Sequence, residues 1–162
     1  MKYCYMDSPV GSLLLAGNDS SLAYIGFPQG KGQVAPAVDW STDEECFGEV
    51  KSQLDAYFAG CRQNFSLNLS PTGTEFQLQV WHALQTIPYG ETRSYRDIAE
   101  SIGRPLAVRA VGAANAKNPL PIVVPCHRVI GANGNLTGFG GGLETKAWLL
   151  DLELSKQKAA QH

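Results

Sequence analysis

The stretch PIVVPCHRVIG, residues 121–131, is the part of the chain around which the rest is organised. Pro125 ends an apolar run, Cys126 and His127 follow it, and Gly131 ends a second short apolar run. The two prolines fix their own φ and lack a backbone donor, so we expect the cysteine on a stiff turn. A thiol beside an imidazole is a candidate activated nucleophile. A buried structural cysteine is the other interpretation, because cysteine is among the most buried residue types.

Composition places the chain among globular proteins. Its 162 residues are 44% hydrophobic and 17% charged, which disfavours disorder and allows one sizeable domain or two small ones. Every apolar run is too short to span a bilayer, and the first residues carry no signal-peptide pattern. We therefore expect a cytoplasmic protein without membrane contact.

The cysteines and histidines do not form a metal-binding pattern. Cysteines stand at positions 4, 46, 61 and 126 without a Cys-x-x-Cys pair, and the histidines at 82, 127 and 162 do not cluster with them. This spacing argues against a zinc finger or a redox dithiol. The even count would allow two disulfides, but an intracellular chain of this size does not need them. We expect neither a metal nor a cofactor.

Charge is distributed unevenly along the chain. Residues 1–70 hold four Lys or Arg against eight Asp or Glu, whereas residues 71–162 hold nine against seven. Six basic residues lie between Arg93 and Arg128, against Asp97 and Glu100. This window is compatible with a surface for a polyanion, and equally with a solvated face.

The first half reads as a small α/β unit. Turn signals separate three short predicted strands, over residues 2–6, 11–16 and 22–27, and residues 26–39 are expected to form a loop. A helix is predicted from Thr42 or Asp43 to about Ala59, and alternation over 65–69 predicts a further strand. The apolar stripe of the helix is expected in the core, and it comprises Phe47, Val50, Leu54, Tyr57 and Phe58.

The second half begins after the turn at residues 70–73. Thr74 and Gln77 have the spacing of a capping box, which predicts a helix that ends in the turn at 87–90. Helices are then predicted over residues 94–102, with Ser94 as cap, and 106–116, separated by a glycine-containing break. This arrangement is typical of a helix-turn-helix that meets DNA, and also of a plain helical hairpin in a core.

The last part combines turns, glycines and a helix. Asn133-Gly134 indicates a hairpin, and residues 138–142 are glycine-rich without Walker or Rossmann spacing, so either a phosphate or another ligand could approach their backbone. A helix is predicted over residues 143–154. We expect its inward face to consist of Leu143, Ala147, Leu150 and Leu154. Glu153 lies in its final turn, where the helix dipole disfavours a carboxylate, so it has either a functional partner or solvent.

Three motifs together resemble the O6-alkylguanine-DNA alkyltransferases, also called methylated-DNA–protein-cysteine methyltransferases. They are Pro-Cys-His-Arg-Val-Ile-Gly at 125–131, Ile-Pro-Tyr-Gly-Glu-Thr at 87–92 and Arg-Ala-Val-Gly at 109–112. The match continues through Gly-Gly-Leu at 141–143 and Trp-Leu-Leu at 148–150 to Glu153, in unbroken order. The N-terminal half matches only in outline, at the Ser-Pro-Val-Gly turn and the Tyr57-Phe58 helix end.

The resemblance implies an α+β fold and a suicide reaction. The expected domains are an N-terminal α/β domain of residues 1–70, ribonuclease-H-like with a three-stranded antiparallel sheet plus a helix, and a C-terminal helix-turn-helix, winged-helix-like domain of residues 71–158. Such a protein flips O6-alkylguanine, and also O4-alkylthymine, out of duplex DNA and takes the alkyl group irreversibly on its cysteine. The implied partner is double-stranded DNA containing O6-alkylguanine, bound by a monomer that is nucleoid-associated in a bacterium or nuclear in a eukaryote.

The resemblance also implies residue roles. Cys126 matches the alkyl acceptor, His127 the base acting through a water, and Glu153 the carboxylate that orients the histidine. Asn118 matches the residue that ties the active-site turn to the helix-turn-helix. Tyr95 matches the tyrosine that contacts the guanine ring and a phosphate. A thiolate is the nucleophile that displacement at an alkyl carbon needs, and a tyrosine hydroxyl could protonate the departing guanine.

Other positions match residues that hold DNA or the flipped base. Arg109 matches the residue that fills the gap left by the base, which offsets part of the unstacking cost. The small side chains of its helix suit the minor groove. Further contacts are expected from Ala110, Gly112, Asn115, Arg128, Val129, Phe139 and Gly140. Asn115 stands where some relatives have an apolar residue, and Gly140 where some have serine, which leaves the range of adducts open.

Two other functions are weighed against repair. A sensor would bind alkylated guanine without transfer, but such proteins lack the acceptor cysteine. A cysteine hydrolase with an unrelated substrate would turn over and would not need a helix-turn-helix.

Overall fold

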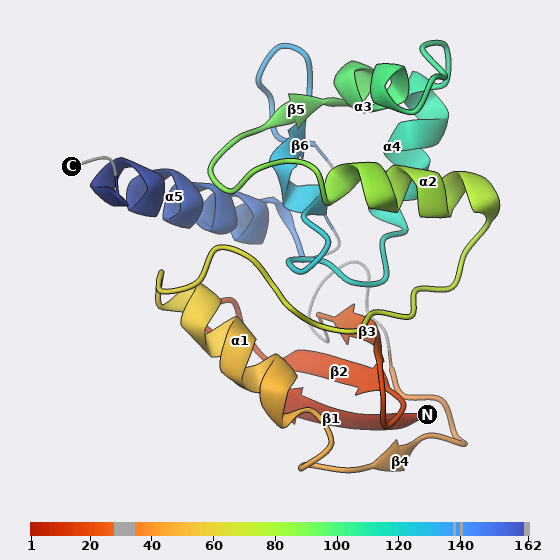
Figure 1. The fold of residues 1–162 in the computed structure, drawn as a ribbon, viewed down its shortest axis with the longest axis vertical. Coiled ribbons are helices and arrows are strands. Elements are labelled where there is room, and N and C mark those ends of the chain that lie inside the picture. Colours follow the sequence, from red (N-terminus) through yellow and green to blue (C-terminus); the bar gives the residue numbers. More distant parts are fainter. Residues whose placement is uncertain (28–34, 138, 140, 161–162) are drawn as a thin grey trace.

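The computed structural model describes residues 1–27, 35–137, 139 and 141–160, in two halves that lie one against the other (Figure 1). The N-terminal half, residues 1–70, holds a sheet with a helix lying across it. The C-terminal half, from residue 71 onward, is mostly helical. The predicted α+β class is confirmed.

The sheet has the strand order β3-β2-β1-β4. The three predicted strands are present as β1 (Lys2–Met6), β2 (Leu13–Gly17) and β3 (Leu22–Gly26), and neighbouring members pair antiparallel. β4 (Ser41–Thr42) has no counterpart in the sequence prediction, because two exposed polar residues give no strand pattern. It pairs parallel with β1.

One face of the sheet packs into the core with the helix α1 (Gly48–Phe58). The helix begins later than the sequence predicts, because the Asp43 side chain accepts a hydrogen bond from the Glu45 N–H in a turn instead of capping the helix. Its buried stripe is the predicted one, with Leu54 and Tyr57 fully buried.

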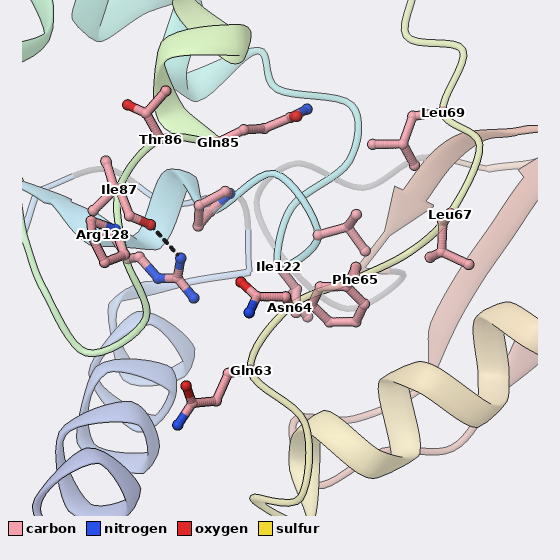
Figure 2. Close-up of a pocket in the computed structure, with 13 residues that line it drawn as sticks. Gln63, Asn64, Phe65, Leu67, Leu69, Gln85, Thr86, Ile87, Ile122 and Arg128 are labelled. Carbon is pink, nitrogen blue, oxygen red and sulfur yellow. Dashed lines mark hydrogen bonds between the residues drawn. The ribbon is translucent and has the colours of Figure 1, made fainter. Parts of the chain in front are cut away.

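The strand predicted over residues 65–69 forms only one bridge, Leu22 opposite Leu69. Alternation persists, since Phe65, Leu67 and Leu69 are more buried than the residues between them. The prediction of a full strand is wrong because this segment leaves the sheet and crosses toward the C-terminal half (Figures 1 and 2).

Three helices pack on one another in the C-terminal half: α2 (Glu75–Leu84), α3 (Tyr95–Ser101) and α4 (Val108–Ala116). Both predicted caps are confirmed, because Thr74 with Gln77 and Ser94 with Asp97 form complete capping boxes. Between α3 and α4, Gly103 has a φ of 76°, which favours glycine. The pair α3–α4 has the predicted helix-turn-helix order.

The motif 125–131 becomes a short 3₁₀ helix, η1 (Cys126–Arg128), followed by β6 (Val129–Ile130). β6 pairs in parallel with β5 (Arg93–Ser94), at the start of α3. The hairpin predicted at Asn133-Gly134 is reduced to a turn, since β6 takes its partner from residues 93–94 instead.

The last helix, α5 (Leu143–Ala160), buries a different face from the predicted one. Lys146, Leu149 and Glu153 are fully buried, whereas Leu143 is 50% and Leu154 45% exposed. The prediction fails because two polar residues on this face have buried partners, so an apolar stripe does not mark it. In the part of the chain that is described, no helix has the length and apolar character of a membrane span.

Candidate functional site

Asn118 fixes the turn that leads into Cys126. Its amide Nδ2 donates to the Val124 carbonyl at 2.8 Å, and its Oδ1 accepts from the Leu120 N–H at 3.0 Å. Within the same turn, Ile122 has a φ of 76°, a strained value for a β-branched residue. Asn118 thus follows the end of α4 and binds the backbone of the turn that leads to Cys126.

Cys126 is a buried, protonated thiol. It is only 5% exposed, and burial raises the pKa of Cys126 to about 11, although the Asn118 side chain and the charge of Lys146 act in the opposite direction. At neutral pH such a thiol is a weak nucleophile. A base must therefore take its proton before it can attack.

His127 is in the right state to be that base. Its ring is fully buried, and burial lowers the pKa of His127 despite the neighbouring carboxylate, so the imidazole is neutral. Nε2 lies 2.7 Å from Glu153 Oε2, which assigns the ring proton to Nε2. Nδ1 then carries the lone pair, and it has no hydrogen-bond partner among the described residues.

The Glu153 carboxylate lies at the centre of the hydrogen-bond network of the site. Its carboxylate faces His127, accepts two hydrogen bonds from Arg128 at 2.7 and 3.0 Å and one from Tyr57 at 2.5 Å, and lies 3.4 Å from the Gly90 N–H. Burial opposes its ionisation, but the bonds from His127 and Arg128 outweigh burial and lower the pKa of Glu153 to about 2. Glu153 is therefore a buried anion that can stabilise a protonated His127.

Arg128 does not lie where the sequence argument expects it. Its guanidinium binds Glu153 and donates from Nη1 to the Ile87 carbonyl at 2.8 Å, over the ring of Tyr89. It is 6% exposed. A buried anion needs a cationic partner, so the role expected at DNA is corrected to that of counter-ion to Glu153.

The remaining residues expected near the base are buried or half-buried. Asn115 is 3% exposed, its Nδ2 lies 3.5 Å from the Cys126 carbonyl, and its Oδ1 has no partner within the described ranges. Phe139 is buried against Phe27 of the N-terminal half, with ring centroids 5.5 Å apart. The Tyr95 hydroxyl lies 2.6 Å from Thr137 Oγ1.

Three further expected contacts lie on α4, beside Asn115. Arg109 and Ala110 are exposed there, free of the core. A Cβ at Gly112 would meet the Tyr95 ring at 3.8 Å, an ordinary contact, so glycine is not required by packing alone. Gly140 lies outside the described residues.

Two residues at the site were missed by sequence reasoning. Lys146 is fully buried and donates to the carbonyls of Val129 and Thr137 at 2.6 and 2.7 Å. Its spacing of seven from Glu153 on one helix was a usable signal. Tyr57 gives no such signal, because it lies 96 positions from Glu153 and reads as core.

A cavity of about 360 Å³ lies behind the cysteine turn (Figure 2). Figure 2 shows Phe65, Leu67 and Leu69 on one side, and Arg128 on the other. Cys126 does not line it.

Comparison with known proteins points to one family. The model of the 6-O-methylguanine DNA methyltransferase ribonuclease-like domain matches residues 1–71, and that of the DNA binding domain matches residues 75–155. Methylated-DNA–protein-cysteine methyltransferases are close relatives: that of Methanosarcina acetivorans is 54% identical, covering 94% of this chain and 98% of its own, and that of Mycobacterium leprae is 55% identical, covering 91% and 89%. The fold is also similar to the crystal structure of Mycobacterium tuberculosis OGT in complex with DNA, with a TM-score of 0.91. The two sequences are 50% identical, and the match covers 96% of this chain and 94% of that one.

Proposed function

The chain belongs to the 6-O-methylguanine DNA methyltransferase family, and we propose that it repairs DNA directly by moving the alkyl group of O6-alkylguanine onto Cys126. It is a methylated-DNA–protein-cysteine methyltransferase that works once. The observation that carries the assignment to Cys126 is a thiol followed directly by a neutral, buried imidazole that a carboxylate orients.

The reaction begins with loss of the thiol proton. His127 Nδ1 receives it through a water, and Glu153 stabilises the imidazolium that results. The thiolate attacks the alkyl carbon, a sulfur–carbon bond forms, and the bond from that carbon to O6 breaks with its electron pair going to guanine. A proton from the Tyr95 hydroxyl neutralises the guanine, and the tyrosinate regains one from the imidazolium by way of solvent. To regenerate the protein, the cysteine thiolate would have to leave from the alkyl carbon of this thioether. An unactivated thioether does not release it, so the protein is not regenerated.

DNA is held by the helix-turn-helix. Arg109 stands exposed on α4 among small side chains, which suits insertion into the minor groove and filling of the gap left by a flipped base. Asn115 Oδ1 is buried and unpartnered among the described residues, and we propose that it accepts a hydrogen bond from the exocyclic amine of guanine. O4-alkylthymine lacks that amine, and we propose it as the weaker substrate.

Residues 1–70 and 71–158 are proposed as two domains of a monomer that acts on alkylated duplex DNA in the cytoplasm, or in the nucleus of a eukaryote. A sensor that only binds alkylguanine is disfavoured, because it would not need a cysteine beside a base and its orienting carboxylate.

The test is the intact mass of the protein after incubation with a duplex containing O6-methylguanine. We expect the gain of one methyl group, and no gain in Cys126→Ser. Cys61→Ser, which alters an exposed cysteine, is the matched control and should still take up the methyl group. If the mass of the protein stays unchanged while it still binds this duplex, the protein is a sensor of alkylguanine and not a repair protein.

A further inference from the structure

One hydroxyl group of the N-terminal half binds the carboxylate that orients His127. Tyr57 lies on α1, and its hydroxyl donates to Glu153 Oε2 at 2.5 Å. Both side chains are fully buried. His127 Nε2 approaches the same oxygen at 2.7 Å. This oxygen therefore accepts hydrogen bonds from both halves of the molecule, and Arg128 Nη2 is a third donor to it, at 3.0 Å.

Packing holds the Tyr57 ring in this position. Its centroid lies 5.6 Å from that of Phe58, 5.5 Å from Phe65 and 6.2 Å from Tyr89. Burial and the adjacent negative charge raise the pKa of Tyr57 far above its usual value. The hydroxyl is therefore protonated at every working pH, and toward Glu153 it acts only as a donor.

We propose that Tyr57 is a positioning residue for alkyl transfer: by donating to Glu153 Oε2 it orients the carboxylate and sets the basicity of His127. This rests on the proposed function. It assigns the N-terminal half a part in the chemistry, beyond support of the other half.

The sign of the effect follows from the shared oxygen. A hydrogen bond from Tyr57 disperses the negative charge of Oε2, which leaves less of that charge to stabilise an imidazolium. Loss of the hydroxyl concentrates the charge again, so His127 should hold its proton more strongly.

Other ionisable groups near the carboxylate are present in both the parent protein and the Tyr57 variant. Those that bind Glu153, or act on it or on His127 through their charge, are Arg128, Tyr89 and Lys146. Arg128 and Lys146 disfavour the imidazolium in both the parent protein and the variant. Their contribution therefore cancels in the comparison.

The experiment compares Tyr57→Phe with Tyr89→Phe. The Tyr89 ring packs against Tyr57, but its hydroxyl has no partner among the described residues. This control therefore removes a buried hydroxyl that makes no hydrogen bond to the carboxylate. Methyl uptake in a single turnover is timed by intact mass across a pH series. His127 is titrated in parallel by NMR in a Cys126→Ser background.

We expect Tyr57→Phe to move the acid limb of the rate profile, and the pKa of His127, upward by about half a unit to one unit. This is a fraction of the effect of one hydrogen bond to a charged group, because the bond acts on His127 only through the shared carboxylate. Tyr89→Phe should leave both unchanged. Coincident profiles for Tyr57→Phe and the parent protein would overturn the inference.

Two further arms keep the result decisive. If Tyr57→Phe does not fold, 3-fluorotyrosine in place of Tyr57 keeps the ring and makes the hydroxyl a stronger donor. The acid limb of the rate profile and the pKa of His127 should then move downward. No movement of either would overturn the inference. If the parent protein takes up no methyl group, the proposed function fails, and the NMR titration alone decides whether Tyr57 sets the basicity of His127.

Discussion

The ammonium of Lys146 lies 2.6 Å from the carbonyl oxygen of Val129, and the lysine side chain is fully buried. A second bond reaches the Thr137 carbonyl, so one cation joins the two ends of the segment that follows the acceptor turn. Its charge also favours the thiolate of Cys126. Among the described residues this buried cation is held by carbonyl dipoles alone, which is costly and points to a role in the site.

Lys146→Met should therefore slow methyl transfer and lower the free energy of unfolding by about 1–3 kcal/mol, because two buried carbonyls lose their donor. Single-turnover kinetics and denaturant unfolding measure the two effects. Lys156→Met changes an exposed lysine of the same helix and serves as the control. Equal behaviour of the two variants would refute a role for the buried ammonium.

Glu153→Gln should lose roughly 100-fold or more in the rate of methyl transfer, since an amide does not stabilise a protonated His127 as a carboxylate does. Arg128 would also be left buried without its counter-ion, which should lower stability by about 3–5 kcal/mol. Glu144→Gln, in the exposed first turn of the same helix, should behave like the parent protein. If Glu153→Gln reacts at the rate of the parent protein, stabilisation of protonated His127 by the carboxylate is not part of the mechanism.

Acid should destabilise the protein in two steps. Burial lowers the pKa of His127, so its contribution to stability is present above about 6.5 and declines as the pH falls below that value. The pKa of Glu153 is lowered from 4.5 to about 2, so its contribution of about 3 kcal/mol is present above 4.5 and is lost as the pH falls toward 2.

Denaturant unfolding at a series of pH values measures this dependence. The difference in unfolding free energy between the parent protein and Glu153→Gln should be largest above pH 4.5 and shrink toward pH 2. A constant difference over that range would show that the carboxylate is not held ionised in the folded state.

Arg109→Ala should slow repair of duplex DNA much more than reaction with free O6-alkylguanine, because only the duplex leaves a gap to be filled. Rates on the two substrates give the comparison. Lys117→Ala, at the end of the same helix, is the control for loss of one positive charge. Equal losses on both substrates would exclude the gap-filling role.

Local signals in the sequence predicted the local structure well. Thr74 with Gln77 and Ser94 with Asp97 marked two helix starts, because a capping box is made by residues within one turn of each other. The start of α1 was placed too early, because Asp43 has the composition of a cap but uses its side chain in a turn. Local propensity could not decide between these two uses.

The sequence predicted the order of the two helices α3 and α4 and the motif that contains Cys126 and His127, because each depends on neighbours along the chain. The α+β class followed from the family resemblance. The buried face of α5, the pairing of Arg128 with Glu153 and the bond from Tyr57 became evident in the folded structure alone. The physical reason is that a buried charge is tolerated only where partners converge on it in space. Those partners come from α1, η1 and the turn after α2. They lie too far from Glu153 along the chain for a helix or strand periodicity to indicate the contact.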